Sequence, residues 1–126
     1  MTDTVNSKFL EFQYLYRDTS NYKAWGVVVL EGSLTDSEQR ELTGRMDGGE
    51  FFVAEQVGVP SLYADLYEFS GGRTADDQCW HEFAGFQPMD EAPEDSPIWG
   101  RTEDFLKAFR GVKRWDLNLS PHSDFF

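Results

Sequence analysis

The sequence predicts a two-layer α+β domain, in which a mostly antiparallel sheet of about five strands packs against two helices. Several segments alternate apolar and polar residues with the period of a half-buried strand, and two others repeat apolar residues at helical spacing. The segments are joined by short connections, which favour antiparallel neighbours with the helices on one face. We expect the order β-β-α-β-β-β-α in a single domain over residues 1–126.

The first two strands are predicted at 9–17 and 22–30. Apolar and polar side chains alternate in "FLEFQYLYR", and "YKAWGVVVL" is rich in β-branched and aromatic residues. The intervening "DTSN" has side chains that bond to nearby backbone groups in turns. These two segments therefore predict a hairpin.

A short helix is predicted to follow. Thr35 and Glu38 fit a capping box, in which each side chain accepts a hydrogen bond from the other residue's backbone N–H. Leu34, Leu42 and Met46 would share the buried face, and "DGG" at 47–49 would end the helix.

Three more strands are predicted, at 50–60, 61–69 and within 76–86. On an extended chain through the last of them, Cys79, His81, Phe83 and Gly85 face one side, whereas Trp80, Glu82, Ala84 and Phe86 face the other. The second helix is predicted with Thr102 as N-cap and its apolar face formed by Phe105, Leu106, Phe109 and Val112.

Composition predicts a soluble, cytoplasmic protein that is a monomer or a small homo-oligomer and needs no cofactor. The chain has one cysteine, so no intrachain disulfide can form. Neither a signal-peptide pattern nor an apolar run long enough to span a membrane is present in the sequence.

The net charge is −12, and it is concentrated in the middle of the chain. Residues 47–104 contain 14 acids and two bases, whereas the remaining residues balance. "QPMDEAPEDSP" at 87–97 predicts an exposed, acidic, semi-rigid loop. A surface of this charge repels nucleic acid, so we expect no direct nucleic-acid partner.

The stretch "DDQCWHEFAGF" at 76–86 holds the most reactive residue types. A cysteine nucleophile needs a cationic neighbour that lowers its pKa, but Cys79 has Asp76, Asp77 and Glu82 around it. Together with His81 these residues carry metal-ligating atoms, yet their spacing matches no zinc or calcium pattern. The sequence therefore predicts no catalytic and no metal site, and structural roles for Cys79 and His81.

The residue types also suggest two other functions. His81 and His122 could form the acid–base pair of a ribonuclease, which the charge disfavours. A small-ligand pocket lined by aromatic side chains remains an alternative function, although the same rings can fill a core. The candidate rings are those of Tyr14, Tyr16, Tyr22, Trp25, Tyr63, Tyr67 and Trp80.

The segments "YLYRDTSNYKAWG", "FFVAEQVGVPSLY" and "CWHEF" resemble parts of small acidic bacterial or phage proteins to which no function is attached. The resemblance implies a cytoplasmic protein of bacterial type and brings no site residues with it.

The acidic region leads to the main functional hypothesis. We expect a non-enzymatic interaction module, such as an inhibitor, immunity or anti-defence protein, that docks an acidic face on a basic, nucleic-acid-handling protein. The same acids can serve only to keep the surface soluble, and this second interpretation stays open. The predicted partner-binding residues are Asp76, Asp77, Glu82, Asp90, Glu91, Glu94 and Asp95.

Overall fold

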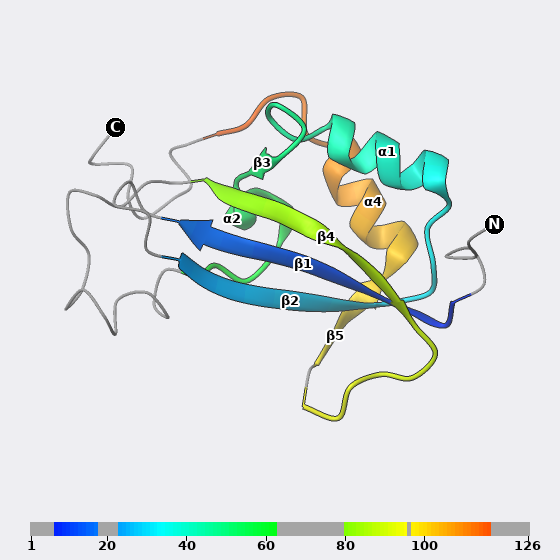
Figure 1. Ribbon diagram of the computed structural model, residues 1–126. Helices are drawn as coiled ribbons and strands as arrows, with labels where there is room; N and C mark the ends of the chain where they lie inside the picture. The colour runs from blue at the N-terminus through cyan, green and yellow to red at the C-terminus, as the bar shows by residue number, and fades with distance from the viewer. Residues whose placement is uncertain (1–6, 18–22, 63–79, 96, 117–126) are drawn as a thin grey trace.

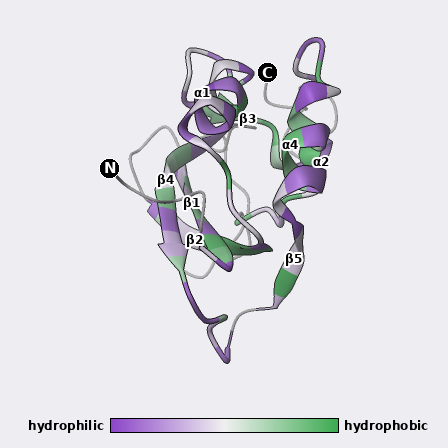
Figure 2. Ribbon diagram, turned by 90° about the vertical axis from the view of Figure 1, so that its right-hand side faces the viewer, coloured by the Kyte–Doolittle hydropathy of each residue, from purple (hydrophilic) through white to green (hydrophobic). Residues whose placement is uncertain are grey.

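The computed structural model describes residues 7–17, 23–62, 80–95 and 97–116. The elements in chain order are β1 (Phe9–Arg17), β2 (Lys23–Glu31), α1 (Asp36–Gly44), β3 (Phe51–Phe52), α2 (Ala54–Val57), β4 (His81–Met89), β5 (Ile98–Arg101) and α4 (Thr102–Arg110). The fold is α+β, as predicted, with the helices against one face of a curled sheet (Figures 1 and 2).

The five strands form one mixed sheet in the order β3-β4-β1-β2-β5. β1 occupies the centre and pairs antiparallel with β2 on one side and β4 on the other. The predicted hairpin is therefore confirmed. β5 pairs parallel with β2, and this strand was not predicted.

The core lies between the sheet and the helices and is largely aromatic. Alternate residues of β1, among them Phe12 and Tyr14, are fully buried on this face. The Phe12 ring lies 4.9 Å from the ring of Phe105 and 5.7 Å from that of Phe52, centroid to centroid. Edge-to-face ring pairs of this kind stabilise beyond the area they bury.

A bulge in β4 changes which side chains of this strand lie on the core side of the sheet. The pairing with β1 shifts between Gln13 and Tyr14, and Gly85 adopts φ 146°, which favours glycine. Phe83 and Phe86 therefore both pack on Phe12. The prediction that they face opposite sides was wrong, because simple alternation does not anticipate an extra residue.

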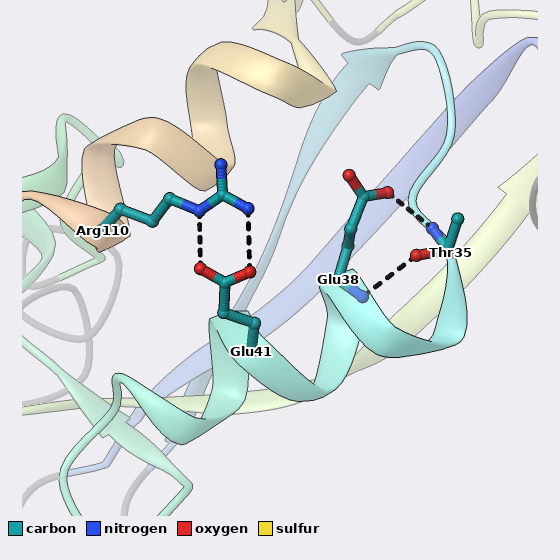
Figure 3. A network of polar contacts seen from close by, with 4 residues as sticks. All are labelled: Thr35, Glu38, Glu41 and Arg110. Carbon is teal, nitrogen blue, oxygen red and sulfur yellow. Dashed lines mark hydrogen bonds and ion pairs between the residues drawn. The ribbon is translucent and has the colours of Figure 1, made fainter.

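Helix α1 forms as predicted. Thr35 and Glu38 make both bonds of the capping box, at 3.1 and 2.9 Å (Figure 3). Leu34, Leu42 and Met46 are buried.

An ion pair ties α1 to α4. The Arg110 guanidinium donates two hydrogen bonds to the Glu41 carboxylate, at 2.5 and 2.8 Å (Figure 3). This contact lowers the pKa of Glu41, chiefly through the hydrogen bond. Two helices far apart in sequence are thus joined at the surface.

Helix α4 begins one residue earlier than predicted. Its N-cap is Arg101, in extended conformation, because β5 runs directly into the helix and its last residue takes the cap position. Thr102 is the first helical residue and is buried. The predicted apolar face of Phe105, Leu106, Phe109 and Val112 is buried as expected.

The predicted strand at 50–60 was wrong. Only Phe51–Phe52 pairs with β4, and the chain then turns into α2. Gly58 ends this helix in left-handed conformation at φ 76°, and Trp99 donates its indole N–H to the Gly58 carbonyl at 2.8 Å. Of the strand predicted at 61–69, residues 63–69 lie outside the described residues.

Candidate functional site

The predicted acidic face divides into parts with different surroundings. Glu82, in β4, accepts hydrogen bonds from Arg17 of β1 at 2.9 and 3.3 Å, and its side chain is only 18% exposed. Its charge is therefore compensated by a base 65 positions away. Asp76 and Asp77 lie outside the described residues.

The other four acids share the loop that joins β4 to β5. Asp90, Glu91, Glu94 and Asp95 are all exposed. No ion pair or hydrogen bond joins their side chains to any residue within 7–17, 23–62, 80–95 or 97–116. The loop was predicted to begin at residue 87, but β4 continues to Met89, so we call residues 90–97 the acidic loop.

The acidic loop is held by the sheet at both ends. Met89, the last residue of β4, pairs with Phe9, and Ile98, the first of β5, pairs with Val29. Pro93 and Pro97 further restrict the backbone. The loop projects from the side of the molecule opposite α1 (Figure 1). A short anchored loop presents its charges at lower conformational cost than a free tail.

His81 is a core residue. It is fully buried, and its Nε2 atom accepts a hydrogen bond from the backbone N–H of Leu62 at 3.0 Å. Its ring lies 5.2 Å from that of Tyr16 and 6.0 Å from that of Phe52. Cys79 lies outside the described residues, so its predicted structural role stays a prediction. Within the part of the chain that is described, His, Cys, Asp and Glu side chains form no group of three suited to a metal.

The aromatic side chains proposed to line a pocket separate into different environments. Tyr14 and Tyr16 belong to the core. Trp25 is 64% exposed and lines a shallow hollow of about 520 Å³ with Gln13, Val27 and Ala84, on the sheet face away from the core. Tyr22, Tyr63 and Tyr67 lie outside the described residues.

A second hollow, of about 410 Å³, contains one of the candidate rings, Trp80, but its other lining residues were not predicted. It is lined by Trp80 and Trp115 together with Arg45, Lys113 and Arg114. The available signal was the run "KRW" shortly after the second helix, where cations are also expected because they complement the helix dipole. Trp80 and Arg45 lie 35 and 70 positions from Trp115 in the sequence, so no local pattern indicates that the three residues meet.

Comparison of the chain with protein-family models, curated proteins and solved structures finds no match. None of the helices within the described ranges is long and apolar enough to cross a membrane. The resemblance to small bacterial or phage proteins stays a prediction.

Proposed function

We propose that this protein is a non-enzymatic interaction domain that docks its acidic loop on a basic surface of another protein. The observation that carries the proposal is the contrast among its carboxylates. Glu41, Glu82 and Glu103 pair with arginines, whereas the loop places four exposed acids close together in sequence, none of which has such a partner among the described residues. Uncompensated charge on an anchored loop is available to a partner.

The chemistry of the partner follows from that charge. Proteins that handle nucleic acid carry basic faces, and an acidic protein surface can occupy such a face in place of the phosphates. An inhibitor or immunity-type role fits this arrangement. The field of the loop is screened over about 8 to 10 Å at physiological salt, so it acts mainly on the association rate.

The test begins with capture of partners from a native lysate at low salt and their identification after elution at high salt. The association rate of the captured partner is then measured with a variant in which Asp90, Glu91, Glu94 and Asp95 become Asn and Gln. We expect association at low salt to slow by about tenfold or more.

A matched control separates the loop from the net charge. The control variant neutralises four acids that are exposed elsewhere on the surface, so it removes the same number of negative charges as the loop variant. These acids are Glu31, Asp36, Glu50 and Asp104. This variant should associate nearly as fast as the native protein. Equal rates for the native protein and the loop variant would show that the loop only solubilises the surface, and equal slowing in both variants would assign the effect to total charge.

A further inference from the structure

The hollow between the C-terminal ends of α1 and α4 gathers positive charge on an otherwise acidic protein. Arg45 is the C-cap of α1, and Lys113 and Arg114 follow α4. All three are exposed, and Asp47 is the one acid that contributes to the lining among the described residues. The described lining therefore carries a net charge of about +2, where the chain as a whole carries −12.

Two indole rings lie in the same hollow. Trp80 and Trp115 are both half-buried and both line it. Each indole packs against another aromatic ring. The ring centroids of Phe51 and Trp80 are 6.4 Å apart, and those of Phe109 and Trp115 are 6.0 Å apart. A partly exposed indole offers a flat apolar surface on which a planar ring can stack.

The segment that carries the hollow is fixed by hydrogen bonds. The Trp115 indole N–H donates to the Arg45 carbonyl at 3.1 Å. Gln56 of α2 donates to the Arg114 carbonyl at 3.0 Å and accepts from the Asp116 backbone N–H at 2.7 Å. The indole and the backbone that carries the flanking cations are thus held in place, which reduces the ordering cost of binding a ligand.

The helix dipole accounts for only part of this arrangement. Cations near a helix C-terminus are stabilising, and Lys107 and Arg110 already fill this role in the last turn of α4. Lys113 and Arg114 lie beyond the cap residue Gly111 and line a concave surface together with Arg45. These three cations are balanced in the described lining by a single acid, Asp47, and a bound anion reduces the repulsion that remains among them.

From these features we propose that the hollow binds a mononucleotide, with the base on the indoles and the phosphate on the cations. Its volume lies within the range of small-molecule sites. Aromatic cages in other proteins bind quaternary ammonium ligands, but the cations in this hollow would repel such a positively charged ligand. The net charge of −12 disfavours a polynucleotide, because only the local field within about a Debye length is positive. The site is independent of the acidic loop, since the segment after α4 and the loop lie on opposite sides of the molecule (Figure 1).

The experiment is calorimetric titration of the native protein with AMP, GMP, CMP and UMP. We expect saturable one-to-one binding of at least one nucleotide, with affinity that falls as salt rises. The double variant Lys113→Ala/Arg114→Ala should weaken it at least tenfold, and Trp115→Leu should weaken it while the variant still melts cooperatively. The control Lys8→Ala/Lys23→Ala, which removes two exposed charges elsewhere, should leave affinity within about twofold.

Several outcomes would overturn the assignment. Absence of saturable binding for all four nucleotides at millimolar concentration would do so, as would unchanged affinity in the Lys113/Arg114 variant. Inorganic phosphate binding as tightly as the nucleotides would show that the indoles contribute nothing. Tighter binding of a short single-stranded oligonucleotide than of any mononucleotide would point to nucleic acid instead.

Discussion

The imidazole of His81 accepts the backbone N–H of Leu62 through Nε2, inside a core where neither group is in contact with water. The bond joins the first residue of β4 to the chain that follows α2. It requires a lone pair on Nε2, so the proton of the neutral ring lies on Nδ1. This histidine therefore holds two segments of the core together.

Replacing His81 with Ala should destabilise the protein by about 3 kcal/mol, because it leaves a cavity among aromatic rings and an unpaired Leu62 N–H. Denaturant unfolding measures the loss. His81→Gln, which keeps a hydrogen-bond acceptor, should cost less than Ala. If the two variants were equally stable, the bond to Leu62 would contribute nothing.

Loss of the capping box should weaken α1. Thr35→Ala removes the side chain that accepts the Glu38 N–H, and such changes cost about 1 kcal/mol. Thr35→Ser keeps the hydroxyl and should stay within a few tenths of a kcal/mol of the native protein. Thermal melts of the two variants compare them directly, and a Ser variant as unstable as the Ala variant would assign the effect to the methyl group.

The Glu41–Arg110 pair predicts a pH-dependent contribution to stability. Arg110 lowers the folded-state pKa of Glu41 below its ordinary value of 4.5. The pair therefore stabilises the fold above pH 4.5, and this contribution is lost as pH falls through the folded value. Urea midpoints of the native protein and of Arg110→Met should differ at pH 6 and converge toward pH 3. A constant difference across this range would contradict the assignment.

Gly26 should not tolerate a side chain. A Cβ atom there would lie 2.8 Å from Leu62 Cδ2 and 3.3 Å from Tyr14 Cζ, so Gly26→Ala requires the buried Leu62 side chain to shift. Overpacking of this kind costs about 1 to 3 kcal/mol. Gly44→Ala is the matched control, because no atom lies within 4 Å of its Cβ position and alanine favours a helix. Chemical denaturation should show opposite changes in the two variants, and equal ones would refute the steric argument.

The parts of the fold that could be predicted carry their signals locally. The alternation over 9–17, the Thr35 capping box and the apolar face of α4 are each complete within about a dozen residues. The acidic loop could be predicted for the same reason, because its prolines and acids are close together in the sequence.

The parts that could not be predicted depend on distant pairing. β5 is four residues long and is defined by its pairing with β2. β3 is two residues long and is defined by its pairing with β4. Glu82 was predicted to belong to the acidic face, because the sequence does not show that it pairs with Arg17, which lies 65 positions away. The hollow at Trp115 gathers residues from three separate segments. Contacts between residues this far apart leave no periodic pattern in the sequence, so they could not be predicted from it.

The central place of β1 affects how the chain can fold during synthesis. Its partner β2 follows at once, but its other partner, β4, ends only at Met89. At 5 to 20 residues per second, the ribosome needs roughly 3 to 12 s to extend the chain from the end of β2 to that point. During this time one edge of β1 lacks its native neighbour, β4, and the face that carries Phe12 and Tyr14 is not yet covered by α4. A nascent chain with such an edge is prone to pair with other strands, so the stretch of translation before Met89 is the interval in which a chaperone benefits this protein most.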